Sequence, residues 1–470
     1  MSDGAEQAVP VDLDELLRQL REEREANARL RQQLDAALAR IAELEDENAK
    51  LRQRLSDLER EAARQAAPFR RREAKKVPPG QKRKPGRKPG HPGAYRQRPG
   101  YVDEEIEVPL PACPTCGGSL EDRQPIVQYI EEIPPIRPRV ARLVTWRAVC
   151  ACCGEVQSVH PLKTSSAGGA AQVQLGPRAK ALAALLNKYH GLPMRKTCSV
   201  LKKLFGLSLT PGGLSQALDR AAEKVWPDYE SLRDQLRGSS AVFADETSWW
   251  VGGPGWWLWT FTNRQATLYA VEESRSSQVV REILGDDFSG VLVSDCLSSY
   301  DPITCRKHKC IAHHLRAIAK ARERPDTPDP TYLDHWRSLF RAVVCLYKLR
   351  DLLTAEDFAA KRTHLEQNCA ALLARVVSQP GDVAVQNRLL KQQAHLLTCL
   401  HEPAAEPTNN PAERQLRPAV IARKVSCGNK TTRGKRTWEA LASLAATCQQ
   451  TARDFLDFLA GRLPLAPQVG

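Results

Sequence analysis

Two short apolar stretches that each end in aspartate decide the fold of this chain: Ala241-Val-Phe-Ala-Asp245 and Gly290-Val-Leu-Val-Ser-Asp295. Runs of this length and composition predict buried β-strands. If the two strands are neighbours, their carboxylates lie at the same edge of one sheet, where they could share Mg²⁺, which prefers oxygen ligands. The alternative is that each aspartate ends its strand because aspartate favours turns. We therefore expect a candidate metal site at Asp245 and Asp295.

The residues between these two stretches predict a further hairpin and a helix. Trp249 to Thr262 is rich in tryptophan around a Gly-Gly-Pro-Gly turn and predicts an antiparallel hairpin, and Val279 to Leu284 predicts a helix. The tryptophans suit the packed interior of a hairpin, although an exposed ring could also stack on a nucleic-acid base.

A third acid, Glu413, stands near the start of a predicted helix. Asn409-Asn-Pro-Ala-Glu413 has the Asn cap and first-turn proline of a helix N-terminus. Backbone N–H groups and the helix dipole favour anions there, so Glu413 could cap the helix or bind a metal ion. Basic residues without any acid follow it, and such a lane fits a phosphodiester held against metal ions: Arg414, Arg417, Arg423, Lys424, Lys430, Arg433, Lys435 and Arg436.

The composition sets broad limits on the class of protein. The chain has 470 residues, and 69 Lys and Arg outnumber 55 Asp and Glu, which suggests a polyanionic partner. At roughly 150 residues per domain, about three domains fit. No long apolar run or signal-peptide pattern occurs, so neither a membrane span nor secretion is expected. The 14 scattered cysteines favour a reducing, cytoplasmic compartment.

The N-terminal stretch carries a heptad repeat from Leu13 to about Ala62, with Asn27 and Asn48 at a positions. Facing asparagines at a positions fix a parallel, in-register pair of helices. We expect residues 11–65 to form a coiled-coil dimerisation helix; a long solvated helix packed on its own chain is the alternative.

The next segment, residues 69–100, is rich in Pro, Gly and basic residues and cannot form a regular helix. Residues 70–98 hold 12 Lys and Arg against Glu73 alone. Such a segment could lie along DNA phosphates or enter a minor groove, and a plain solvated linker is the alternative. The summed net charge of this segment and of the lane after Glu413 is larger than the net charge of +14 of the whole chain. The remaining residues therefore carry a slight net negative charge. The candidate DNA contacts are Arg83, Lys84, Arg87 and Lys88 here, and Arg414, Arg417, Arg423 and Lys424 in the lane.

Two cysteine motifs predict a zinc-ribbon-like module at residues 101–165. Cys113 and Cys116 form one C-x-x-C pair, and Cys150 and Cys153 form another, each followed by glycine. Four thiolates make a closed, structural zinc site. Cys152 is a spare that could substitute for one ligand, and the alternating residues Ile133 to Val149 predict ribbon strands between the pairs. Residues 170–238 follow and predict helices, with Thr210-Pro211 starting one; they suit a helix-turn-helix or an ordinary helical hairpin.

The ordered set of motifs resembles the insertion-sequence 66 family of transposases. Its later blocks are Val-Ser-Asp295-Cys-Leu-Ser-Ser-Tyr300, Cys310-Ile-Ala-His313-His-Leu-Arg316 and Asn409-Asn-Pro-Ala-Glu413-Arg-Gln-Leu-Arg417-Pro. The resemblance implies an α/β multidomain protein with a ribonuclease H-like catalytic core over residues 240–450 and a DDE triad at Asp245, Asp295 and Glu413. It also implies a helical insertion near residues 325–402, with a C-terminal tail at 451–470. A bacterial, nucleoid-associated enzyme acting on transposon ends and target DNA is expected, with accessory element-encoded proteins as further partners.

Such a site supports two-metal phosphoryl transfer. Two Mg²⁺ ions, for which Mn²⁺ can substitute, would lie about 3.5–4 Å apart and activate first water and then a DNA 3′-hydroxyl. His313 would position a metal-bound water or a phosphate, or would be an ordinary packed histidine. The alternative function is a catalytically inactive zinc-containing DNA-binding protein derived from a transposase, which convergence of the three carboxylates would disfavour. A zinc hydrolase is disfavoured because four thiolates leave zinc no open position.

Overall fold

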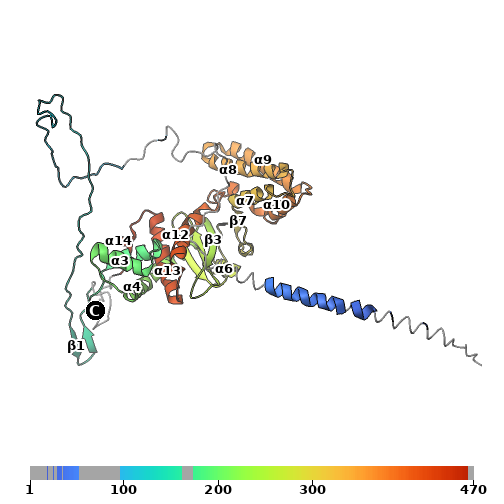
Figure 1. Cartoon of the computed structure of the whole chain (residues 1–470), viewed down its shortest axis with the longest axis horizontal. Helices are drawn as coiled ribbons and strands as arrows, with labels where there is room; N and C mark the ends of the chain where they lie inside the picture. The colour runs from blue at the N-terminus through green and yellow to red at the C-terminus, as the bar shows by residue number, and fades with distance from the viewer. Residues whose placement is uncertain are drawn as a thin grey trace, which may run out of the picture. The chain divides into compact units, whose positions relative to one another are not determined.

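The computed structural model describes residues 18, 25, 29–33, 35–51, 91, 96–160 and 173–463, and it divides into two units, Met1–Arg72 and Glu73–Gly470 (Figure 1). In the first unit, residues 29–33 and 35–51 are helical, as the heptads predict. The apolar heptad side chains Leu30, Ile41, Leu44 and Leu51 are exposed there. The remaining heptads lie outside the described residues.

A mixed five-stranded sheet is the centre of the second unit. Its spatial order is β5-β4-β3-β6-β7, in which the first three strands are antiparallel neighbours while β6 and β7 run parallel to β3. The strands are β3 (Ala241–Trp249), β4 (Trp256–Thr262), β5 (Thr267–Glu272), β6 (Val291–Ser294) and β7 (Arg306–Lys309). The predicted strands at residues 241 and 290 and the tryptophan-rich hairpin are confirmed, and α6 (Ser277–Leu284) confirms the predicted helix. The prediction that the first strand ends at Asp245 is wrong, because pairing with β4 continues β3 to Trp249.

The pairing of β3 with β6 assigns residues to the two faces of the sheet. Ala241 lies opposite Val291 and Phe243 opposite Val293. Side chains alternate between faces along a strand, so these four residues share one face, where they pack with Ala412. Residues of the other parity, such as Val242, Ala244 and Leu292, belong to the large core on the opposite face.

Helix α13 (Thr432–Gln450) covers the outer edge of the sheet. The backbone N–H groups of β5 that no strand pairs donate to its side chains: Thr267 N to Thr447 Oγ1 (3.0 Å), Tyr269 N to Ser443 Oγ (2.9 Å) and Val271 N to Glu439 Oε1 (2.6 Å). The acceptors stand four residues apart, which places them on one side of the helix. An edge strand left open would be a site for unwanted strand pairing.

Helices that precede the sheet in the sequence and a helix near the C-terminal end of the chain share the large core. They are α2 (Pro177–Ala184), the π-helix η2 (Leu185–Tyr189), α3 (Met194–Phe205), α4 (Pro211–Lys224), α5 (Trp226–Arg237) and α14 (Phe455–Arg462). Thr210 Oγ1 accepts from Gly213 N and caps α4, as predicted. The predicted helical region at 170–238, the sheet and part of the predicted C-terminal tail therefore contribute to one hydrophobic core.

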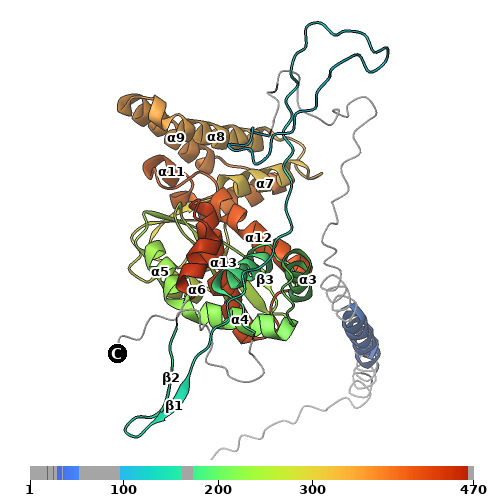
Figure 2. The same ribbon diagram turned by 90° about the vertical axis from the view of Figure 1, so that its left-hand side faces the viewer.

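The segment between β7 and the last helices forms a second, helical core. It comprises α7 (Ile311–Arg322), α8 (Thr331–Lys348), the 3-10 turn η4 (Arg350–Leu352), α9 (Ala355–Ala374), α10 (Pro380–Lys391), the 3-10 turn η5 (Gln393–His395) and α11 (Thr398–His401). Trp336 and Phe340 are fully buried in it. In Figure 2 the helices α8, α9 and α11 gather together, apart from α4 and α5. Residues 325–402 are thus helical, as the family resemblance implies.

Residues 96–160 hold only one small sheet, β1 (Arg147–Cys150) paired with β2 (Gly154–Gln157). The prediction of ribbon strands from Ile133 to Val149 is wrong except for its last three residues. Pro134, Pro135 and Pro138 remove the amide donors that a ladder needs. Over the described ranges, no helix is both long and apolar enough to cross a membrane.

Candidate active site

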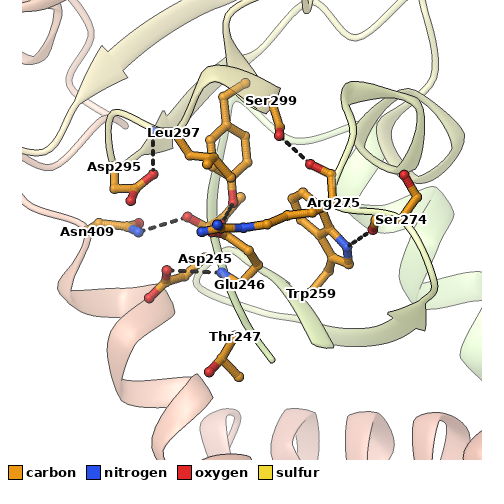
Figure 3. Close-up of polar contacts among 12 residues, drawn as sticks. Asp245, Glu246, Thr247, Trp259, Ser274, Arg275, Asp295, Leu297, Ser299 and Asn409 are labelled. Atoms are coloured by element: carbon orange, nitrogen blue, oxygen red, sulfur yellow. Dashed lines mark hydrogen bonds and ion pairs between the residues drawn. The ribbon is translucent and has the colours of Figure 1, made fainter. Parts of the chain in front are cut away.

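Asp245 and Asp295 each stand two residues beyond the last residues that pair between β3 and β6, Phe243 and Val293. Extending the pairs Ala241–Val291 and Phe243–Val293 by two residues places Asp245 opposite Asp295, on the face that α12 (Asn410–Ser426) covers. Both carboxylates accept a local backbone hydrogen bond: Glu246 N donates to Asp245 Oδ1 at 3.0 Å, and Leu297 N donates to Asp295 Oδ1 at 2.9 Å (Figure 3).

Asn409, the N-cap residue of α12, attaches the start of that helix to the same strand. Its Nδ2 donates to Ala244 O at 2.8 Å, and its backbone N donates to Cys310 Sγ at 3.1 Å (Figure 3 shows the first bond). Glu413 follows on the first turn, where its backbone N donates to Asn409 O. The asparagine side chain therefore fixes α12 to β3 rather than capping its own helix. Its Oδ1 is buried and has no hydrogen-bond partner among the described residues.

The three predicted acids lie within electrostatic reach of one another. The pKa of Asp245 is raised to about 7, mainly by burial and then by the negative charges of Glu246, Asp295 and Glu413, against the lowering effect of the Glu246 N–H. Such a cluster of repelling carboxylates favours a cation. Arg316 supplies one positive charge, since its Nη2 donates to Glu413 Oε1 at 2.9 Å.

His313 lies within electrostatic reach of Asp295, Glu413 and Arg316. Burial and the Arg316 charge lower the pKa of His313, while Asp295 and Glu413 oppose that shift. Its Nδ1 is buried without a hydrogen-bond partner in the described part of the chain. The imidazole is therefore neutral at pH 7 and adjoins the acid cluster.

The oxygen donors fit a hard cation by their chemistry, because carboxylate and amide oxygens are the ligands that Mg²⁺ takes. The side chains do not converge to a closed shell. Within residues 96–160 and 173–463, no three His, Cys, Asp or Glu side chains are grouped closely enough to hold a metal ion. Neither the acid cluster nor the four cysteines form such a group in this part of the chain.

The cysteines form two separate knuckles. Backbone N–H groups of Thr115 and Cys116 lower the pKa of Cys113, and those of Cys152 and Cys153 lower the pKa of Cys150. Stabilising a thiolate in this way suits a thiolate metal ligand. Each C-x-x-C pair is thus formed locally, while the two pairs are not assembled into one group of four.

The basic lane after Glu413 divides into two sets. Four residues have partners within the protein: Arg423 donates to Thr247 Oγ1 and Ser248 Oγ at 2.9 Å, Arg433 pairs with Asp219, Lys435 pairs with Glu439, and Arg436 lies over the Trp226 ring. The side chains of the other four form no hydrogen bond or ion pair within the described ranges: Arg414, Arg417, Lys424 and Lys430. Arg423 is therefore engaged in holding α12 to the end of β3. The basic residues Arg83, Lys84, Arg87 and Lys88 lie outside the described residues.

The sequence did not indicate that two further residues, Asn409 and Arg316, belong to this site. The sequence predicts Asn409 only as part of a helix cap, and Arg316 only as part of a motif. Arg316 stands three residues after His313 on α7, so the two side chains share one face of that helix, and this spacing was the available signal.

Comparison with known proteins gives a family match and two similar relatives. The model of the family described as "Transposase IS66 family" matches residues 172–437. The chain is also 24% identical over 432 residues to the uncharacterized protein y4qI of Sinorhizobium fredii, covering 79% of this chain and 74% of the relative. The uncharacterized protein y4jD of the same organism is 24% identical over 394 residues, covering 76% and 75%.

Proposed function

This chain belongs to the IS66 family of transposases, and we propose that it cleaves and joins DNA strands at a divalent-metal site formed by Asp245, Asp295 and Glu413. The observation that supports the proposal is the parallel register of β3 and β6, which, continued by two residues beyond Phe243 and Val293, would set Asp245 opposite Asp295. The mixed sheet, with three antiparallel strands followed by two parallel ones, is consistent with a ribonuclease H-like core.

The proposed mechanism is metal-assisted phosphoryl transfer. Two Mg²⁺ ions, when bound, lower the pKa of an attacking water or 3′-hydroxyl and stabilise the leaving oxygen. Asp245 would present oxygens from within β3, Asp295 from the residue after β6, and Glu413 from the first turn of α12. His313, neutral at pH 7, would position a metal-bound water or a phosphate beside these acids.

This proposal is tested with the full-length protein and duplexes that carry the ends of its parent element. We expect strand-specific nicking in Mg²⁺ or Mn²⁺, followed by joining of the freed 3′ end to target DNA, and no product in EDTA. Products that form equally in EDTA would refute metal-dependent chemistry.

A second candidate function is a catalytically inactive DNA-binding protein derived from a transposase. The observation that favours it is that the three carboxylates are not grouped closely enough to hold a metal ion by themselves. DNA binding without any metal-dependent nicking is the result that would select it.

We propose that zinc joins the two cysteine knuckles into one structural site. The apolar side chains of residues 101–159 are largely exposed, among them Val108, Ile126, Ile130 and Val140, and none of this segment belongs to a described hydrophobic core. A small module without a core is stabilised by a metal ion.

The zinc proposal predicts one zinc ion per chain, measured by mass spectrometry of the purified protein. Cys113→Ser and Cys150→Ser should each lose the metal and make residues 101–160 sensitive to protease. Cys152→Ser is the matched control, and full zinc content is expected of it. Loss of zinc in Cys152→Ser with retention in Cys150→Ser would exchange the two assignments.

We propose that the N-terminal helices of two copies pair as a coiled coil. The exposed Leu30, Ile41, Leu44 and Leu51 would be covered in such a homodimer. The basic segment that follows would grip DNA phosphates without reading sequence, and further element-encoded proteins and a nucleoid location remain expectations of the family.

The unpartnered basic residues of α12 are proposed to contact DNA beside the acids. Replacing Arg414, Arg417 and Lys424 together with alanine should weaken DNA binding and reduce the slope of log affinity against log salt by about 2 to 3, since each phosphate contact contributes about 0.9. Binding is measured by fluorescence anisotropy at several salt concentrations. The charge-matched control is Arg341→Ala with Lys348→Ala and Lys361→Ala in the helical insertion, for which a wild-type slope is expected. Equal slopes for both triple variants would contradict the contact.

A further inference from the structure

A buried carboxylate, Glu246, lies directly behind the proposed acid pair. It follows Asp245 on β3, and because strand side chains alternate, it points to the opposite face of the sheet. The side chain is 2% exposed. It accepts three hydrogen bonds: from Arg275 Nη2 at 2.6 Å, from Arg275 Nε at 3.3 Å and from Tyr300 Oη at 2.7 Å. Figure 3 shows Arg275 reaching Glu246 on one side of the strand, with Asp295 and Asn409 on the other.

The two partners of Glu246 come from different segments. Arg275 follows β5, where its guanidinium also lies 4.4 Å from the Trp257 ring centroid. Tyr300, which is fully buried, ends the 3-10 turn η3 (Ser298–Tyr300) that follows Asp295. Ser299 Oγ donates to Arg275 O, so the two segments also contact each other. The chain that leaves Asp295 on one face thus returns to β3 on the other.

A second attachment fixes the same loop to β7. Lys309, fully buried, places Nζ 3.2 Å from Asp301 Oδ1 and 3.3 Å from Ser294 Oγ. The same Nζ lies 5.6 Å from the Tyr300 ring centroid. Residues 294–301 are therefore held at their two ends by β7, and through Tyr300 by β3.

We propose that Glu246, Arg275 and Tyr300 form a positioning clamp that keeps Asp295 in register with Asp245. This inference rests on the proposed function, because it supposes that the two aspartates bind metal together. The β3–β6 ladder ends at Phe243 and Val293, two residues before the aspartates, so it does not itself hold them. Tyr300 and Glu246 supply the next connection between the two strand ends.

The test compares two tyrosine variants of the full-length, DNA-free protein. Tyr300→Phe removes only the hydroxyl that reaches Glu246. Tyr229→Phe is the matched control, because Tyr229 is also buried and donates one hydrogen bond, to Tyr269 O at 3.0 Å on β5. Mg²⁺ titrations are followed by the shift in melting temperature, which needs no catalysis.

Both variants should melt a few degrees lower than wild type without metal, as loss of one buried hydrogen bond implies. Tyr300→Phe should raise the half-saturating Mg²⁺ concentration about tenfold, which is typical when a partner behind a metal ligand is lost, whereas Tyr229→Phe should leave it unchanged. Arg275→Gln should match Tyr300→Phe, and the double variant should be little worse than either, because both act through Glu246.

An unchanged Mg²⁺ response in Tyr300→Phe, with a responsive wild type, overturns the clamp and leaves the proposed function standing. A wild-type protein that shows no Mg²⁺-dependent shift overturns both.

Discussion

Asp295→Asn is expected to reduce strand cleavage and joining at least about a thousandfold, a loss of about 4 kcal/mol of transition-state stabilisation. The amide keeps the size of the side chain and can still accept the hydrogen bond from Leu297 N. It removes one negative charge from the cluster that attracts the metal ions. Affinity for DNA should stay within about twofold of wild type, because the proposed phosphate contacts of Arg414, Arg417 and Lys424 are untouched.

Asp286→Asn is the matched control for this variant. Asp286 is an exposed aspartate in the loop before β6, so the same substitution there should leave cleavage unchanged. Cleavage and joining are measured with duplexes that carry the element ends, and affinity with the same duplexes in anisotropy. Full activity in Asp295→Asn would show that the aspartate pair does not perform the chemistry.

Local patterns predicted the pieces of this site, and long-range pairing assembled them. The strand that contains Asp245, the strand that ends just before Asp295, and the helix that starts just before Glu413 follow from short-range apolar patterns and a capping signal. That Asp245 and Asp295 face each other depends on a parallel register between strands about fifty residues apart, and hydropathy alone does not specify such a register.

Side-chain partners were less predictable than backbone elements. The charge pattern predicts Arg423 as a DNA contact, because it does not distinguish basic residues that point to solvent from those that bond within the protein. Its partners, Thr247 and Ser248, are about 175 residues earlier in the chain. Glu246 gave no signal beyond its place next to Asp245, since its partners Arg275 and Tyr300 come from two later segments.

The metal affinity of this site is expected to rise steeply with pH. The pKa of Asp245 is raised to about 7, mainly by burial and then by the neighbouring acids, so below pH 7 a metal ion must displace a proton from it. Affinity for Mg²⁺ should therefore increase about tenfold per pH unit between pH 5.5 and 7 and level off above pH 7. His313 should contribute little in this range, because its pKa is lowered and the ring is already neutral.

In the metal-free protein, by contrast, folding stability is expected to fall as the pH rises. A carboxyl whose folded pKa exceeds its unfolded value of 3.8 stabilises the fold by binding a proton, and that contribution is lost as the pH rises toward 7. The pKa of Glu439 is also raised to about 7, mainly by burial, so this residue changes stability in the same direction. Glu439 is not one of the proposed metal ligands. Melting temperature should thus fall from pH 5.5 to 8 without Mg²⁺, and saturating Mg²⁺ should restore most of the part due to Asp245.

Two variants separate these contributions when melting is followed from pH 5.5 to 8.5 with and without Mg²⁺. Glu439→Gln, which can still accept from Val271 N, should flatten the metal-free pH dependence and leave the Mg²⁺ dependence intact. Asp245→Asn should weaken Mg²⁺ binding and abolish its dependence on pH. If the pH dependence of Mg²⁺ affinity persisted in Asp245→Asn, another group would be the one that exchanges its proton for the metal, and the assignment of Asp245 as a ligand would fall. The wild-type profile alone cannot make this distinction, because Asp245 and Glu439 titrate over the same range.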